Sequence, residues 1–266
     1  MNFVSFASGS SGNCLLLREG RTAVLIDAGI SLRRIKAGLA RQALTPDDLA
    51  GVLITHEHSD HTAALPMLLK YYGKRLHIYA PPVVAHELER TVAGIGEHLV
   101  PIVPGEPVEL KNFTLTAFPT PHDTPESVGY VLEGKSARFG LCTDTGCVTE
   151  TMTAALAGCD AAVIEANHDP EMLRTGRYPV YLKRRILSER GHLSNADCAA
   201  FACTLAKSGV GTLILGHLSR ENNRPSLAER TVREALDGEG YSAVTLLVAP
   251  AEGDLELEVT PCCASN

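Results

Sequence analysis

Apolar positions along the chain fall into short runs and longer periodic segments. Runs of strand length lie at 2–6, 14–17, 23–26, 51–54, 77–80, 99–103, 108–109, 113–119, 127–133, 137–142, 161–165, 212–215, 244–248 and 255–259. Segments with helical spacing lie at 32–43, 63–72, 82–93, 149–156, 171–190, 195–208 and 226–236. Because strand-rich and helix-rich stretches follow each other in two rounds, the pattern predicts an α/β fold, a four-layer αββα sandwich of two facing sheets. No linker or low-complexity tract interrupts the pattern, so we expect a single domain over residues 1–266.

Composition narrows the class of protein. Hydrophobic residues make up 45% of the chain and aromatic residues only 5%, so the core is expected to consist mainly of Ala, Val, Leu and Ile. The net charge is −7, which means that any contact with nucleic acid needs a local basic patch or bound metal. The chain has no CxxC pair, no signal-peptide pattern at its start and no apolar stretch approaching the roughly 18 residues of a membrane span. We therefore expect a cytoplasmic protein with reduced thiols and no membrane contact.

The densest polar cluster follows the apolar run at 51–54. Its sequence, THEHSDH at 55–61, places four potential metal ligands within six residues. A strand end that opens into a turn aims several side chains into one cleft, and imidazole with carboxylate suits zinc, manganese or iron. The alternative, solvated histidines in a loop, fits so dense a cluster poorly. The motif therefore predicts a metal site.

Further His and Asp residues stand where other apolar runs stop. His122 follows the run at 113–119, Asp144 the run at 137–142, and His217 the run at 212–215. Each of them, taken alone, is more often an ordinary loop or core residue. Combined with the four ligands of the motif they complete a set of seven, which is enough for two metal ions.

The order of these residues resembles the metallo-β-lactamase superfamily: THEHSDH, a distant His, the Asp of TDTG and a final His in GH. The resemblance covers roughly residues 1 to 220 and implies a metal-dependent hydrolase with a dinuclear site. It implies that one metal is held by His56, His58 and His122. The other metal would be held by Asp60, His61 and His217, with Asp144 bridging both. The implied cofactors are two divalent metal ions, zinc or manganese, with iron as a further option.

Four more segments resemble one branch of that superfamily. FASGSSGNC near the start, EANHD at 165–169, RGHLSN at 190–195 and LGHLSREN at 215–222 look like the YycJ (WalJ) branch. Members of that branch are regarded as DNA exonucleases acting from the 5′ end, so the resemblance implies a DNA substrate. GHLS at 191–194 is also similar to the phosphate-contacting histidine segment of the β-CASP nucleases, although their long inserted domain is missing here.

The expected chemistry follows from two neighbouring cations. Such a pair lowers the pKa of a bridging water and generates hydroxide near neutral pH, while one cation stabilises the leaving oxygen. Asp60 is the expected catalytic carboxylate, which binds metal and orients the water or accepts its proton. His192 is the second expected catalytic residue, and with Ser194 and Asn195 it would donate hydrogen bonds to a phosphate. The alternative is that Ser194 only caps the next helix and His192 is a loop residue.

Small and polar residues in other loops are further candidates for substrate binding. Ser8 and Ser10 lie in a loop whose backbone N–H groups could face an anion, although an ordinary turn between strands fits equally well. Asn167 and His168 follow the run at 161–165. His168 is expected to contact substrate or to support a metal ligand, and a plain polar loop remains the alternative.

Basic residues suggest where a phosphate chain would lie. Arg220 and Asn222 come just after His217 and could reach a phosphate near the second metal. The segment at 171–190 carries six basic residues, which either follow a nucleic-acid backbone or form a solvated helix face.

Three functions are compatible with these features. The leading hypothesis is phosphodiester hydrolysis, as a 5′-to-3′ DNA exonuclease acting through a metal-bridging hydroxide. The alternative is a hydrolase of small esters, thioesters or lactams on the same dinuclear site, which the negative net charge favours. A third is a metal-binding regulatory protein without turnover, and the complete ligand set argues against it. The sequence does not indicate an oligomeric state.

Overall fold

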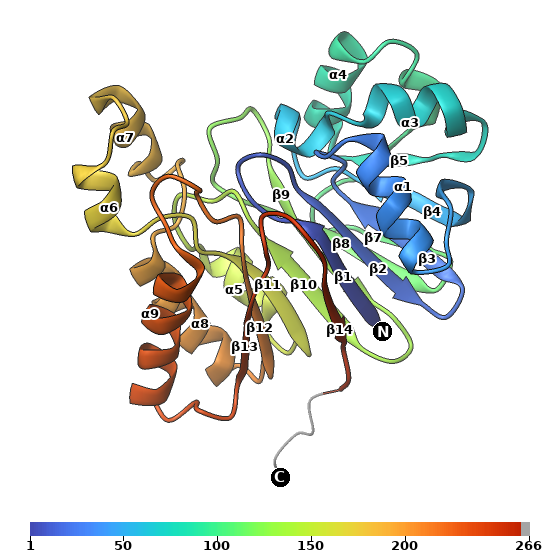
Figure 1. The fold of residues 1–266 in the computed structure, drawn as a ribbon. Coiled ribbons are helices and arrows are strands. Elements are labelled where there is room, and N and C mark those ends of the chain that lie inside the picture. The colour runs from blue at the N-terminus through green and yellow to red at the C-terminus, as the bar shows by residue number, and fades with distance from the viewer. Residues whose placement is uncertain (262–266) are drawn as a thin grey trace.

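The computed structural model describes residues 1–261 and has the four layers expected from the sequence. Two seven-stranded sheets pack face to face, and helices cover both outer faces (Figure 1). Strands buried on both faces carry near-continuous apolar runs, which is how the parallel strands of this chain stood out in the sequence. The α/β sandwich predicted from the hydropathy pattern is therefore confirmed.

The first sheet comes mainly from the N-terminal part of the chain and has the order β14-β1-β2-β3-β4-β5-β6. Its strands are β1 (Asn2–Ala7), β2 (Cys14–Glu19), β3 (Thr22–Ile26), β4 (Leu49–Leu53), β5 (Ile78–Ala80), β6 (Leu99–Pro101) and β14 (Leu255–Glu258). Strands β3 to β6 run parallel, and the remaining pairs are antiparallel. The outer face is covered by α1 (Leu32–Arg41), α3 (Leu65–Tyr72) and α4 (Pro82–Thr91), while α2 (Ser59–Thr62) lies just beyond the end of β4.

The second sheet has the order β13-β12-β11-β10-β9-β8-β7. Its strands are β7 (Pro107–Leu110), β8 (Phe113–Pro119), β9 (Val128–Glu133), β10 (Arg138–Cys142), β11 (Ala161–Glu165), β12 (Thr212–Gly216) and β13 (Thr245–Val248). Strands β10 to β13 run parallel. The outer face is covered by α5 (Glu150–Leu156), α8 (Asn195–Lys207) and α9 (Pro225–Gly238). Short 3₁₀ turns at Pro46–Asp48, Gly73–Arg75 and Gly96–His98 complete the regular structure outside residues 170–190.

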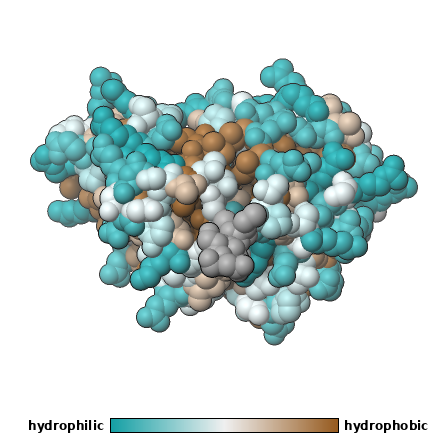
Figure 2. Space-filling model, turned by 90° about the horizontal axis from the view of Figure 1, so that it is seen from below, coloured by the Kyte–Doolittle hydropathy of each residue, from teal (hydrophilic) through white to brown (hydrophobic). Residues whose placement is uncertain are grey.

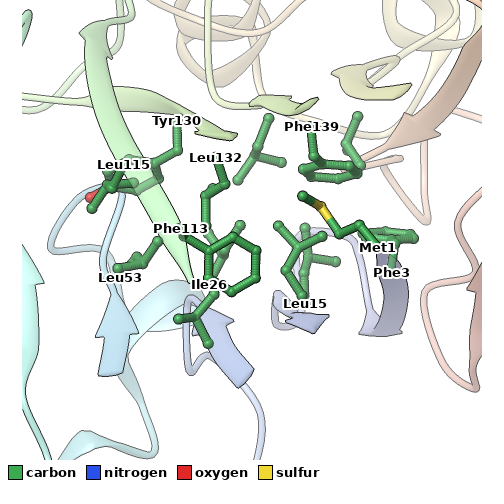
Figure 3. Packing of buried hydrophobic residues seen from close by; sticks show 14 of the residues in the cluster. Met1, Phe3, Leu15, Ile26, Leu53, Phe113, Leu115, Tyr130, Leu132 and Phe139 are labelled. Carbon is green, nitrogen blue, oxygen red and sulfur yellow. The ribbon is translucent and has the colours of Figure 1, made fainter. Parts of the chain in front are cut away.

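The central core lies between the two sheets (Figure 3). Phe3 of the first sheet stacks on Phe139 of the second, with ring centroids 5.0 Å apart. Tyr130 of β9 is fully buried and donates its hydroxyl hydrogen bond to the carbonyl oxygen of Ile54 at 2.5 Å. Because Ile54 immediately precedes the THEHSDH motif, this bond ties the start of the motif to the opposite sheet.

The segment at 171–190 is the clearest departure from the predicted elements. It was expected to be one helix, but it forms α6 (Pro170–Thr175) and α7 (Val180–Ile186) with a break at residues 176–179. A Cβ at Gly176 would lie 2.6 Å from both Asn222 Oδ1 and Met172 O, so the chain passes closer to its neighbours than a side chain allows. Pro179 then disfavours helix for the residue before it. The prediction of a single helix was wrong because charge spacing does not report such a break.

The surface at the end where β1 begins is mostly hydrophilic, with an apolar band across it (Figure 2). Leu247 of β13 and Leu255 and Leu257 of β14 are half-buried and pack against the central core from the two edge strands. Among the described residues, no helix combines the length and the apolar character that crossing a membrane requires.

Candidate metal centre

The residues singled out in the sequence meet at one end of the sandwich. In the first sheet, the motif follows β4 and Asp27 follows β3. In the second sheet, Asp144 follows β10 and His217 follows β12, while His122 lies in the loop after β8. Because parallel strands end at the same edge, the carboxyl ends of both sheets bring these side chains together. The structure thus assembles all seven predicted ligand residues in one place, and metal binding by them stays a prediction.

The first ligand set is made almost entirely of imidazoles. His56, His58 and His122 each offer a ring nitrogen, and these atoms lie within 4.8 Å of one another. His56 Nε2 and His58 Nδ1 are 3.0 Å apart, closer than two protonated rings would tolerate. His122 is fixed from behind, since its Nδ1 lies 3.2 Å from the carbonyl oxygen of Gly191. This set could hold one cation and keep a further coordination position open.

The second ligand set mixes imidazole and carboxylate. Asp60, His61 and His217 also offer atoms within 4.8 Å of one another. Asp60 Oδ2 lies 3.5 Å from His61 Nε2 and 3.7 Å from His217 Nε2. The Asp60 side chain is 26% exposed, whereas the two histidines are buried, so Asp60 is the member of the set that water can reach.

Asp144 lies between the two sets. Its Oδ2 is 3.4 Å from His61 Nε2, and its Oδ1 is 3.8 Å from His122 Nε2. Asp144 Oδ2 and His217 Nε2 are buried, and neither has a hydrogen-bond partner among the described residues. Buried polar atoms without partners are costly, and a bound cation would satisfy both. The donor set therefore fits two divalent ions that share this carboxylate.

Two buried carboxylates support the histidines of the second set, and sequence reasoning did not assign them that role. Asp27 Oδ2 accepts a hydrogen bond from His61 Nδ1 at 2.7 Å, and Glu165 Oε1 accepts one from His217 Nδ1 at 2.7 Å. Such bonds fix the ring orientation and leave Nε2 for a metal. Both acids stand at the end of an apolar run, which is the same signal that revealed Asp144.

Electrostatics separate the two sets. Burial lowers the pKa of His61 and His217, but the carboxylates of Asp27, Asp144 and Glu165 outweigh burial. The pKa of His217 rises to about 10, and that of His61 rises well above its usual value. In the first set, burial and the neighbouring imidazoles hold the pKa of His56 well below its usual value, and burial also lowers that of His122.

The backbone is strained at three of these positions. Asp27, Asp144 and His217 have φ angles of 61°, 56° and 55°, in the left-handed region that residues with a Cβ rarely adopt. Each follows a buried strand, so the left-handed turn redirects the side chain into the site. Such strain costs of order 1–3 kcal/mol per residue and persists where surrounding contacts enforce it.

His192 lies next to the ligands and shares a support with one of them. Its Nδ1 is 2.8 Å from Glu165 Oε1, the same oxygen that bonds to His217. Its ring centroid is 5.1 Å from that of His122. Burial lowers the pKa of His192, but the charge and hydrogen bond of Glu165 raise it above its usual value. His192 therefore lies at the edge of the site as a hydrogen-bond donor, with its side chain 20% exposed.

Six of the nine predicted substrate-binding residues are buried: Ser8, Asn167, His168, Ser194, Asn195 and Asn222. Ser8 Oγ accepts a hydrogen bond from His217 N at 2.9 Å, and Asn167 Nδ2 donates to His217 O at 3.0 Å. These two residues hold the strained backbone of His217. The loop around Ser8 satisfies its own N–H groups, because Gly9 N donates to Asn13 Oδ1 and Gly12 N to Gly9 O.

Ser194 and Asn195 are also occupied within the protein. Ser194 is the N-cap of α8, where its hydroxyl oxygen accepts a hydrogen bond from Asp197 N at 3.1 Å. Asn195 exchanges hydrogen bonds with Asn223 at 2.8 and 3.0 Å. The Ser194 side chain thus caps α8, as the alternative prediction for this residue stated.

The remaining candidates differ in exposure. His168 and Asn222 are each 1% exposed, and none of their side-chain polar atoms has a hydrogen-bond partner among the described residues. Arg220 is exposed and pairs with Glu252 at 2.5 Å. Ser10 is exposed at the tip of its loop. Among the nine, only His192, Arg220 and Ser10 are open to a substrate without rearrangement.

Comparisons with known proteins agree with this geometry. Residues 22–218 match the family model described as beta-lactamase superfamily domain. An exodeoxyribonuclease YycJ from Bacillus anthracis is 35% identical, with 91% of each chain covered. An exodeoxyribonuclease WalJ from Streptococcus pneumoniae is 37% identical, over 85% of this chain and 84% of the relative.

Solved structures support the fold. The metallo-beta-lactamase fold protein YhfI from Bacillus subtilis superposes with a TM-score of 0.74 at 16% identity, covering 96% of this chain and 99% of that one. At that identity the likeness concerns the fold alone. Taken with the family match and the two curated relatives, the ligand order and the αββα layers identify the chain as a metal-dependent hydrolase that belongs to the YycJ/WalJ-like branch of the metallo-β-lactamase superfamily.

Proposed function

We propose that this hydrolase cleaves phosphodiesters as a 5′-to-3′ DNA exonuclease with two divalent metal ions. The observation that carries the proposal is the pair of ligand sets joined at Asp144, since two adjacent cations suit in-line displacement at phosphorus. The two curated relatives named exodeoxyribonuclease support DNA as the substrate. The six described cysteines are free, which suits a reducing compartment, and we propose that the enzyme acts in the cytoplasm.

The first ligand set would hold one ion and the second set the other, as zinc or manganese, with iron as a further option. Bound there, the ions would supply a bridging hydroxide near neutral pH and neutralise charge on the phosphate. Asp60 is the partly exposed carboxylate of the second set and would orient the water and accept its proton.

His192 would bind the phosphate. Its Nδ1 is engaged by Glu165, which leaves Nε2 as the nitrogen that can donate to a phosphate oxygen. Against the effect of burial, Glu165 raises the pKa of His192, which favours the charged form of the ring, and a charged donor binds phosphate more strongly than a neutral one. Glu165 also holds His217. The residue that would bind phosphate, His192, and a candidate ligand of the second metal, His217, are therefore positioned by the same carboxylate.

The proposal is tested with purified protein, added manganese and a 5′-labelled, 5′-phosphorylated DNA duplex. We expect the wild type to shorten the duplex from its 5′ end, and Asp60→Ala and His61→Ala to abolish shortening. His192→Ala should weaken DNA binding yet retain two metals per chain. The proposal fails if duplex and single strands stay intact with several metals while a thioester or small ester is hydrolysed, which would establish the alternative function.

A further inference from the structure

The α6–α7 segment, residues 170–190, lies at the outer end of the second sheet and packs broadly on no other described element (Figure 1). Its second helix, α7, buries Ile186 but exposes large apolar side chains in its first turn and at its C-cap. Val180 is 65% exposed, Tyr181 74% and Leu187 59%. A helix that buried its apolar residues would hide these positions, so their exposure needs an explanation.

The segment is nevertheless fixed to the metal centre. Arg190 donates hydrogen bonds to the carbonyl oxygens of His122 and Thr124 at 2.7 and 2.6 Å. Arg185 forms an ion pair with Asp123, the residue next to ligand His122. Arg185 of α7 and Arg190 just beyond it therefore both contact the loop that carries His122, which links α7 to the first ligand set.

The basic residues of the segment divide into two groups. Arg174 pairs with Glu171, Lys183 donates to Arg174 O at 2.8 Å, and Arg185 pairs with Asp123. Arg177 and Arg184 are exposed and have no ion pair or hydrogen-bond partner among the described residues. Arg184 lies one helical turn from both Val180 and Tyr181, so cationic and aromatic side chains share one exposed face.

We propose that this exposed face of α7 binds the DNA strand that leads to the metal centre. Tyr181 stacks on a base, Arg184 contacts a backbone phosphate, and Val180 and Leu187 cover the edge of the base. The inference rests on the proposed exonuclease function. It adds a binding surface for the strand outside the two ligand sets. Aromatic side chains beside unpaired cations are how proteins bind single strands without reading their sequence.

Charge and distance favour nucleic acid over a second copy of the chain. The net charge of −7 does not attract nucleic acid, so the local charge of this face decides its partner. Arg177 and Arg184 would meet like charges if two copies packed this face on itself, whereas a phosphate backbone offers them the opposite charge. Tyr181 precedes Arg185 by one turn, about 6 Å along the axis at about 1.5 Å per residue. A DNA strand rises about 3.4 Å per nucleotide, so a strand that follows α7 passes from Tyr181 to Arg185 within about two nucleotides.

The test measures binding of manganese-loaded protein to 5′-phosphorylated single strands that carry 2-aminopurine at successive positions and phosphorothioate linkages that resist hydrolysis. We expect the wild type to quench the fluorescence at one or two positions near the 5′ end. Tyr181→Ala should remove the quenching and raise Kd by about 5- to 150-fold, whereas Tyr181→Phe should keep both. Arg184→Ala should reduce the slope of log Kd against log salt by about one.

Controls separate this inference from the proposed function. Tyr71→Ala removes a tyrosine that is 59% exposed on α3 and should leave DNA binding unchanged. Hydrolysis of bis(p-nitrophenyl) phosphate, which is too small to reach α7, should be equal in the wild type and in Tyr181→Ala. If the wild type and Tyr181→Ala have equal Kd and equal quenching, the inference about α7 is overturned while the proposed function stands.

Two other outcomes also overturn it. If the wild type neither binds nor cuts DNA, the proposed function fails and this inference with it. If Tyr181→Ala dissociates a dimer in sedimentation while leaving DNA affinity unchanged, the face is a contact between copies of the chain. Because Tyr181 is exposed, an unchanged melting temperature is expected to show that the variant remains folded.

Discussion

The two ligand sets lie side by side but are prepared for a cation in opposite ways. In the second set, His61 and His217 each bond to a buried carboxylate, and their pKa values are raised. In the first set, His122 bonds to a backbone carbonyl, and burial lowers the pKa of His56 and His122. Asp123, a carboxylate next to His122 in the sequence, forms an ion pair with Arg185.

This difference means that a cation would displace protons to a different extent in the two sets. A cation that enters the second set replaces protons within existing ion pairs, so the geometry is set before the metal arrives. A cation that enters the first set meets His56 and His122, whose pKa values are lowered by burial, so weaker competition from protons is expected there. We expect the second set to bind more tightly once deprotonated, because more negative charge surrounds it, and to depend more steeply on pH.

The largest effect is expected for the residue that both sets share. Asp144→Ala removes the carboxylate that lies between the two sets, so both ions should be lost and hydrolysis should fall to background. Metal analysis after dialysis and a nuclease assay measure this. Asp48→Ala, at an exposed 3₁₀ turn, is the matched control. One ion retained by Asp144→Ala would show that one set does not need the shared carboxylate.

The next largest effect is expected on thermal stability, because both sets span the two sheets. Each combines residues that follow β4 of the first sheet with a histidine of the second sheet, so an ion bound in either set would join the two sheets. An ion present at roughly 100 to 1,000 times its Kd stabilises the fold by about 2.7 to 4.1 kcal/mol. Removing both ions with a chelator should lower the melting temperature by several degrees, measured by calorimetry. If only one ion contributes, titrating metal back should restore the temperature in one step.

A smaller effect is expected from the carboxylate behind the second set. Asp27→Asn keeps the size of the side chain and tolerates the left-handed backbone, but it removes the charge behind His61. Metal affinity of the second set should fall about 10- to 100-fold, as for other partners of metal-bound histidines. Competition with a fluorescent chelator measures it, and Asp47→Asn serves as the control. An equal loss from both sets would contradict independent support of the second one.

The smallest effect is the pH dependence of each set. The folded pKa of His217, about 10, exceeds its usual value, so protonation stabilises the metal-free fold below the usual pKa and this contribution disappears as pH rises through about 10. Metal competes with the proton, so affinity should rise about tenfold per pH unit for each proton displaced. His58→Ala isolates the second set and His217→Ala the first. Calorimetry of metal binding in two buffers should detect proton release in His58→Ala, where only the second set is intact. Equal proton release in both variants would show that the two sets do not differ in pH dependence.

The residues that meet in the candidate site could be predicted from the sequence, because they stand in local features of it. THEHSDH at the end of an apolar run needs no partner to be recognised, and the alternation of runs predicted the four layers. The roles of Asp27 and Glu165 could not be predicted, because they depend on which strand ends face each other. Ser8 and Asn167 were expected to meet substrate, yet they support His217, since burial of a loop depends on the register of distant strands.

The division of ligands between the two sheets also sets an order of events during synthesis. The ribosome releases the motif at 55–61 long before His217, and domains fold from the N-terminal side first. A nascent chain that has emerged as far as β6 carries His56 and His58 but lacks every ligand of the second sheet. The seven candidate ligand residues are therefore complete only once β12 is present, so a chain truncated before β12 would lack His217 and with it one member of the second set.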